Sequence, residues 1–138
     1  MDLELRDARR SAADREWLTN VYPFYLHDLS EFDSSYYTLD DRGRWRPDHR
    51  PSWLQEDTNH PLLLVESGRR VGFALVNQAP SPHVGSGIDF RMSEFFVLRA
   101  HRGRGIGRRA VFALFDRFPG RWETSDPAHV RQVIDTTG

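Results

Sequence analysis

The sequence predicts a single α/β (α+β) domain over residues 1–138, with one sheet flanked by helices. Apolar stretches typical of strands recur along the chain, and two of them are joined by a short turn that contains Gly. Two other segments repeat apolar residues at the spacing of one helix face. At 138 residues the chain is long enough to bury one hydrophobic core.

The first elements lie before residue 30. Apolar and charged residues alternate over residues 3–6, which predicts a short strand. Residues 11–14 resemble a capping box that opens a helix, and Pro23 predicts a kink or a split within that helix. The apolar residues expected on its buried face are Trp17, Leu18, Val21, Phe24, Tyr25 and Leu29.

Loops and strands alternate in the middle of the chain. Residues 30–50 are polar, acidic and rich in turn formers, which predicts a long loop over a pocket, and residues 51–57 predict a short helix. Residues 61–66 and 71–76 are apolar runs on either side of a turn, so we expect a hairpin of two buried strands. Residues 79–87 are rich in Pro, Ser and Gly and predict another loop.

The remaining elements follow in quick succession. Residues 88–98 predict the central strand, residues 105–118 a helix ended by a Pro-Gly pair, and residues 121–123 one more strand. Residues 126–134 predict a last helix, because an Asp stands at its N-cap position and a Pro at its first position.

The connection between the central strand and the next helix is the most informative stretch. It contains Arg102, Gly103, Arg104, Gly105 and Gly107. A helix N-terminus presents unpaired N–H groups and a positive dipole end, glycines let an anion approach the backbone, and arginines add charge-assisted hydrogen bonds. The stretch therefore predicts a diphosphate site. An Arg-rich surface loop that only caps the helix is the alternative.

The spacing excludes two common phosphate motifs. A P-loop needs a Lys, which this chain lacks, and the glycines are spaced G-x-G-x-G and not G-x-G-x-x-G. Arg102-x-x-Gly105-x-Gly107 instead resembles the R/Q-x-x-G-x-G/A signature of the GCN5-related N-acetyltransferase (GNAT) family. The resemblance covers most of residues 1–123, and residues 118–123 look like a subgroup of small bacterial predicted acetyltransferases.

The resemblance implies a mixed, mostly antiparallel central sheet flanked by helices, and a loop that binds the pyrophosphate of acetyl-CoA. It further implies an acetyl-CoA-dependent N-acetyltransferase whose acceptor is an amine of a small molecule or of a protein. The residues expected to bind the co-substrate are Phe96, Val97, Leu98, Arg102, Gly103, Arg104, Gly105, Ile106, Gly107 and Arg108.

The C-terminal part departs from the family pattern. Family members usually continue with an Asn-x-x-Ala segment, a helix with an aromatic residue near the thiol, and a final strand or two. Residues 124–138 contain no Tyr and no Asn. We therefore expect the C-terminal strands to be shortened or missing, and the family's Tyr acid cannot be assigned. Truncation, divergence and completion by a partner, such as a second copy in a homodimer, remain alternatives.

Glu94 is the candidate catalytic base. Met92, Phe95 and Phe96 give it an apolar setting, so its pKa is expected to rise, which suits acceptance of the amine's proton directly or through water. A structural carboxylate at a strand end is the alternative. If the central strand splays as in the family, a backbone N–H of Val97 or Leu98 would stabilise the oxyanion. Weaker candidates are His27, Asp28, Tyr22, Tyr25, Tyr36 and Tyr37.

Composition excludes several other chemistries. The chain has no Cys, which excludes disulfides and a Cys acyl-enzyme, and its six His show no metal-ligand spacing, so no metal is expected. Residues 1–60 hold 13 acidic residues against eight Arg, and residues 61–138 hold seven against 11. This asymmetry suits a cationic acceptor and an anionic cofactor, or reflects ordinary surface charge. No signal peptide or membrane-length apolar run is visible, so we expect a cytoplasmic protein without a membrane partner.

Three functions are compatible with these features. An N-acetyltransferase is the first, and a non-catalytic acyl-CoA-binding module, motivated by the divergent tail, is the second. A nucleic-acid binder, motivated by five Arg within residues 99–109, is the third. Because the net charge of the whole chain is only −1, no nucleic-acid partner is expected.

Overall fold

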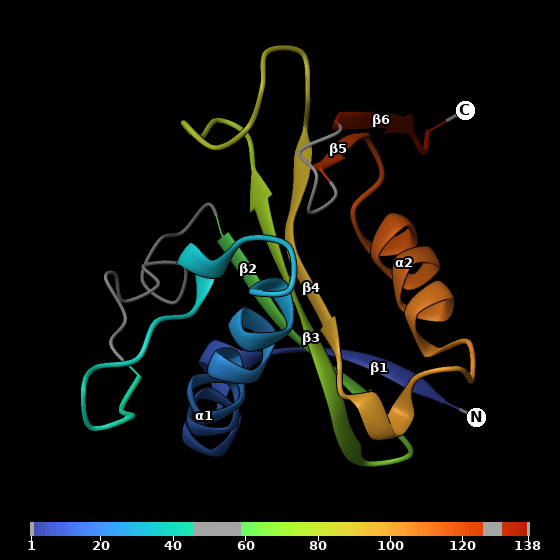
Figure 1. Cartoon of the computed structure of the whole chain (residues 1–138). Helices are drawn as coiled ribbons and strands as arrows, with labels where there is room; N and C mark the ends of the chain where they lie inside the picture. The colour runs from blue at the N-terminus through green and yellow to red at the C-terminus, as the bar shows by residue number, and fades with distance from the viewer. Residues whose placement is uncertain (1, 46–58, 126–130, 138) are drawn as a thin grey trace.

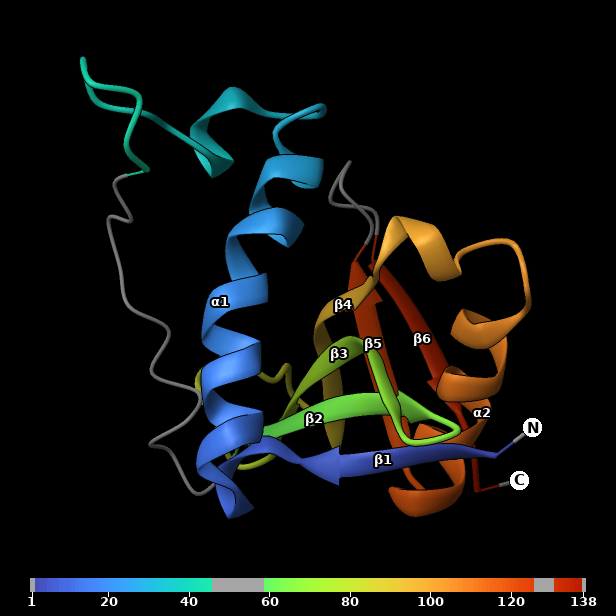
Figure 2. The ribbon, with the colours of Figure 1, turned by 90° about the horizontal axis from the view of Figure 1, so that it is seen from below.

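The computed structural model describes residues 2–45, 59–125 and 131–137. Its strands form one sheet in sequence order, and neighbours are antiparallel except for the last pair but one, which is parallel. Helix α1 (Ala12–Leu29) covers one face of the sheet and α2 (Ile106–Arg117) the other (Figures 1 and 2). The predicted fold is confirmed. The strands are β1 (Leu3–Asp7), β2 (Asn59–Glu66), β3 (Arg69–Gln78), β4 (Phe90–Val97), β5 (Arg121–Ser125) and β6 (Arg131–Asp135).

Apolar side chains form a separate core on each face of the sheet. On the α1 face, Leu18 packs with Leu63 and Phe73. On the α2 face, Leu114 packs in the cluster that contains Leu64. Adjacent residues of β2 thus face opposite cores, because successive side chains of a strand point to opposite faces. This explains why residues 61–65 of β2 are a continuous apolar run and do not alternate with polar residues.

Helix α1 begins where the sequence predicts. The Ser11 hydroxyl accepts the Asp14 N–H at 3.3 Å, and the buried Asp14 carboxylate binds Arg6 of β1 and Arg70 of β3. The helix continues past Pro23, so the predicted split does not occur. Packing of its buried face on the sheet outweighs the effect of an internal Pro, which destabilises a helix by about 3 kcal/mol.

The predicted hairpin is formed by β2 and β3, which turn at residues 67–68. Residues 79–87 lie in a loop, as predicted, and residues 30–45 contain only a short 3-10 turn as helical structure. The predicted helix over residues 51–57 lies outside the described residues. In the described part of the chain, no helix combines the length and apolarity needed to span a bilayer.

The C-terminal prediction is wrong in two respects. Arg131–Asp135 form strand β6, where the sequence predicts a helix through Ile134, and the C-terminal strands are therefore present. Val133 and Ile134 are β-branched and favour a strand, and antiparallel pairing with β5 satisfies the backbone groups of alternate residues of β6. The helix-capping signal at residues 126–127 lies outside the described residues.

Strands β4 and β5 pair over only part of their length. Residues 90–92 of β4 pair with residues 122–124 of β5, and the two strands separate beyond them (Figure 1). The connection between these parallel strands runs through α2, whose N-terminus lies at the separated end. The second half of β4 therefore has an edge that β5 does not cover, and this is the splay that the resemblance implies.

Replacing Gly72 by alanine should destabilise the protein. A Cβ at this position would overlap the backbone oxygen of Phe96 and lie 3.0 Å from the Val97 Cα. Because relief requires β3 and β4 to move apart, we expect the free energy of unfolding to fall by about 1–3 kcal/mol, measured by chemical denaturation. The control Gly107→Ala, whose Cβ would meet only the Phe95 ring at 3.7 Å, should not lower it. Equal unfolding midpoints for native protein and Gly72→Ala would contradict this packing.

Candidate functional site

Residues 98–105 connect the end of β4 to the start of α2, and we call them the Arg/Gly loop. Gly103 and Gly105 have φ values of 79° and 77°, which glycine adopts without the penalty of other residues. Gly105 is the N-cap of α2, and no side chain among the described residues caps this helix start. The N–H groups of its first turn are therefore oriented to bind an anion from outside the helix.

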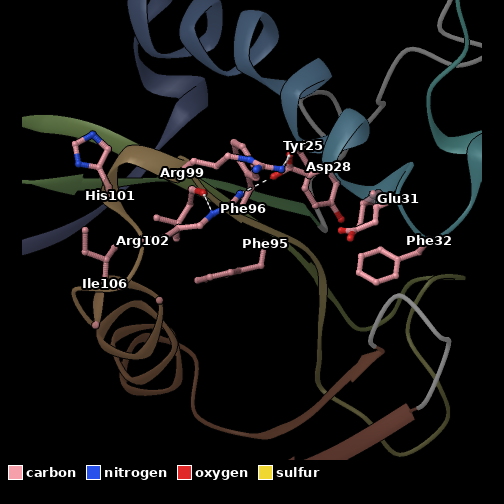
Figure 3. Close-up of a pocket in the computed structure, with 15 residues that line it drawn as sticks. Tyr25, Asp28, Glu31, Phe32, Phe95, Phe96, Arg99, His101, Arg102 and Ile106 are labelled. Carbon is pink, nitrogen blue, oxygen red and sulfur yellow. Dashed lines mark hydrogen bonds and ion pairs between the residues drawn. The ribbon is translucent and has the colours of Figure 1, made fainter.

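A cavity of about 540 Å³ opens beside this loop, between the end of α1, the end of β4 and the start of α2 (Figure 3). We call it the loop cavity. Most of the residues that the sequence assigns to the co-substrate contribute to its wall, which is consistent with their close spacing in the chain. The predicted residues that line it are Phe96, Val97, Arg102, Gly103, Gly105, Ile106 and Gly107.

Three predicted residues do not line the loop cavity. The Leu98 N–H donates to the Val71 carbonyl of β3 at 2.9 Å. Arg104 lies 3.4 Å from the Glu66 carboxylate at the end of β2, and the Arg108 guanidinium stacks over an aromatic ring of α2. Their side chains or backbone groups thus support the loop and the helix from outside the cavity.

Asp28 is an acidic residue of the loop cavity to which the sequence assigns only a weak role. It accepts hydrogen bonds from Arg102 at 2.5 Å and from Arg99 at 3.1 Å, as the dashed lines of Figure 3 show in part. Burial raises the pKa of Asp28, but the hydrogen bonds from the two arginines outweigh burial and leave that pKa lowered. Asp28 follows the buried Val21 by seven residues, and this helical spacing indicates that it lies on the buried side of α1.

Val97 turns its backbone groups toward the opening between β4 and β5. Because the Leu98 N–H is donated to β3, the alternation along a strand directs the N–H and C=O of Val97 to the other side. The Arg102 Nε donates to the Val97 carbonyl at 2.7 Å, in agreement with this direction. The sequence offers the N–H of Val97 or of Leu98 as the donor to the oxyanion. Only the N–H of Val97 faces the gap between β4 and β5.

A second cavity, of about 520 Å³, shares Tyr25, Leu29 and Phe95 with the first. We call it the Glu94 cavity. The Tyr22 hydroxyl donates to the Glu94 Oε1 at 2.6 Å, whereas the buried Oε2 has no hydrogen-bond partner among the described residues. Burial raises the pKa of Glu94 to about 7, although the hydrogen bond from Tyr22 lowers it. Glu94 is therefore a carboxyl suited to exchange a proton at neutral pH.

Some of the weaker candidates line a cavity, and the others lie outside both cavities. Tyr22, Tyr25 and Tyr36 line the Glu94 cavity. Burial raises the pKa of Tyr22 and of Tyr25, and the charge of Glu94 raises both further. The His27 ring packs edge-on against Tyr37, with 5.1 Å between ring centroids, and neither residue lines either cavity. The cavity that contains Glu94 is therefore lined by tyrosines and not by His27.

Solved structures with a similar fold include known acetyltransferases. A ribosomal-protein-alanine N-acetyltransferase from Brucella melitensis biovar Abortus 2308 gives a TM-score of 0.52 at 23% identity, over 84% of this chain and 70% of that one. GCN5 from Tetrahymena gives 0.61 at 11% identity, over 91% and 71%. A mutant Bacillus halodurans protein gives 0.56 at 14% identity, over 85% and 74%. At these identities the likeness shows the fold alone. No curated protein sequence matches this chain significantly.

A sequence match covers the parts of the fold that build both cavities. The profile of the acetyltransferase (GNAT) family matches residues 16–126. This range includes most of α1, all of β4, the Arg/Gly loop, α2 and β5. The chain therefore belongs to the GNAT family of acetyltransferases.

Proposed function

We propose that this protein transfers an acetyl group from acetyl-CoA to a primary amine, by direct attack of the amine on the thioester. The observation that carries the proposal is the meeting of two cavities at Phe95. One contains the anion-binding loop, and the other contains the buried carboxyl of Glu94. This arrangement supports a ternary complex in which the acetyl donor and the acceptor lie side by side.

The loop cavity has the features that the diphosphate of acetyl-CoA requires. A Cβ at Gly103 or Gly105 would meet nothing within 4 Å, so these positions leave open space in front of the backbone. We assign the diphosphate to the first-turn N–H groups of α2 and to Arg102, which would exchange its contact with Asp28 for the diphosphate. When bound, acetyl-CoA supplies the thioester whose carbonyl the amine attacks.

Glu94 and Val97 have complementary roles in this mechanism. Glu94 is partly ionised at neutral pH and lines the cavity, and its carboxylate takes the proton of the attacking amine directly or through a water molecule. The Val97 N–H donates to the oxygen on which negative charge develops. Because the chain contains no Cys, no thiol carries the acetyl group between donor and acceptor.

An acceptor screen that follows release of free CoA, run beside calorimetric titration with acetyl-CoA, tests the proposal. We expect acetyl-CoA to bind and CoA release to depend on an added amine. Binding without transfer to any small-molecule or protein amine would favour a non-catalytic acyl-CoA-binding module. Absence of binding would contradict the assignment of the loop cavity.

Replacing Tyr22 by phenylalanine should raise the pKa of Glu94, because the Tyr22 hydroxyl stabilises the ionised carboxyl. Loss of a hydrogen bond worth about 1.4 kcal/mol corresponds to about one pKa unit. The acid limb of the pH–rate profile should move upward by that amount, and the rate at high pH should change little. Tyr25→Phe is the control, since no hydrogen bond joins Tyr25 to Glu94 among the described residues. Identical acid limbs for the two variants would contradict this role of Tyr22.

A further inference from the structure

The Glu94 cavity contains one cation and one carboxyl among the described residues that line it, Arg91 and Glu94. A bulge in β4 brings them to the same face of the sheet. The register of β4 against β3 shifts here, so that Ser93 is an extra residue without a partner opposite it. In a regular strand, residues three apart would point to opposite faces. Because the bulge lies between them, Arg91 and Glu94 occupy neighbouring positions on one face, about 7 Å apart along the strand.

The guanidinium of Arg91 is only partly engaged by its neighbours. Its Nη2 donates to the Ser125 hydroxyl at 3.2 Å, and its Nη1 lies 3.6 Å from the Glu123 carboxylate, beyond hydrogen-bond distance. The Glu123 carboxylate already accepts from the Arg131 Nε and from the Gly85 N–H, each at 2.9 Å. Since a guanidinium carries five N–H donors, Arg91 can bind another carboxylate through two of them.

We propose that the acceptor is an α-amino acid, whose carboxylate Arg91 binds and whose amine is thereby directed to Glu94. This inference rests on the proposed acetyl transfer and names its acceptor class. An amine and a carboxylate on one carbon atom, with a hydrogen bond at each end, suit two positions about 7 Å apart along a strand. Leu26 and Leu29, together with the tyrosines of the cavity, favour an apolar or aromatic amino-acid side chain.

Two pairs of compounds that differ only in the carboxylate test the proposal: phenylalanine against phenethylamine, and leucine against 3-methylbutylamine. At equal concentrations of neutral amine, kcat/KM with acetyl-CoA should be about 10–100-fold higher for the amino acid of each pair, because a charge-assisted contact is present. Arg91→Met should bring this ratio close to one by lowering the rate with the amino acid alone. Arg117→Met, which removes a cation that lines neither cavity, should leave the ratio unchanged.

Calorimetric titration of the same compounds into CoA-loaded protein separates this inference from the proposed function. Amino-acid binding that is tighter than amine binding and weakened by Arg91→Met, without transfer, would support the acceptor site and contradict the transferase. Transfer to the amines at equal or higher kcat/KM would support the transferase and overturn the acceptor class. A ratio that survives Arg91→Met in a folded variant with native acetyl-CoA affinity, or no binding of either amino acid, would also overturn it.

Discussion

Replacing Glu94 by glutamine should lower the rate of acetyl transfer by roughly 10²–10⁴-fold, the usual effect of losing a general base. Glutamine keeps the shape of the side chain and still pairs with the Tyr22 hydroxyl, but its amide cannot accept the amine's proton. The affinity for acetyl-CoA should stay nearly unchanged, because Glu94 does not line the loop cavity. Steady-state kinetics and calorimetry on the same preparation measure the two effects separately.

The pH dependence gives this prediction a second readout. Burial raises the pKa of Glu94 to about 7, so the ionised base accumulates as the pH rises through that value. The native rate should therefore rise across neutrality, and the variant should lack this limb. The deficit of the variant should shrink at high pH, where more of the amine is already neutral. A poorly folded variant with normal specific activity would instead make Glu94 a structural carboxylate, and the proton would leave through solvent or a tyrosine.

Replacing Gly105 by aspartate should abolish measurable binding of acetyl-CoA, with a loss of affinity of about 100-fold or more. The variant places a carboxylate at the N-cap of α2, where we assign the diphosphate, and like charges repel at this distance. The φ of 77° at this position adds a strain of about 1–2 kcal/mol for any residue with a Cβ. Calorimetric titration with acetyl-CoA measures the loss.

Variants at two other glycines distinguish the effect of the added charge on acetyl-CoA binding from the effect of backbone strain. Gly68 has a φ of 81° in the β2–β3 turn and nothing within 4 Å of its Cβ position, so Gly68→Asp carries the same strain away from the cavity. It should bind acetyl-CoA like the native protein. Gly107→Ala should also bind, because its Cβ would make only an ordinary contact with Phe95. Native affinity in folded Gly105→Asp would end the assignment of acetyl-CoA to this loop.

The parts of the site that depend on neighbouring residues could be predicted from the sequence. Arg102, Gly105 and Gly107 lie together between an apolar strand and an apolar helix. Their chemistry therefore predicts a diphosphate site at this loop without knowledge of any distant contact. The raised pKa of Glu94 follows in the same way from its apolar neighbours in β4.

Contacts between distant segments could not be predicted. Tyr22 binds Glu94 across 72 positions, and Asp28 binds Arg102 across 74, because α1 packs over β4 at an angle that no local pattern encodes. The prediction of a helix at β6 is wrong for a related reason. A run of five residues is too short for its period to distinguish helix from strand, and pairing with β5 decides the outcome.

Unfolding would return the Glu94 carboxyl to water, where glutamate has an ordinary pKa near 4.3. Because its folded pKa is raised to about 7, the protonated carboxyl stabilises the fold at acidic pH, and this contribution is lost as the pH rises through 7. Above that pH the folded protein holds a buried charge whose Oε2 has no partner among the described residues. Glu94→Gln should then be the more stable protein in alkaline denaturation experiments, by up to about 3 kcal/mol. The carboxyl that we propose as the general base thus lowers the stability of the folded protein once it is ionised.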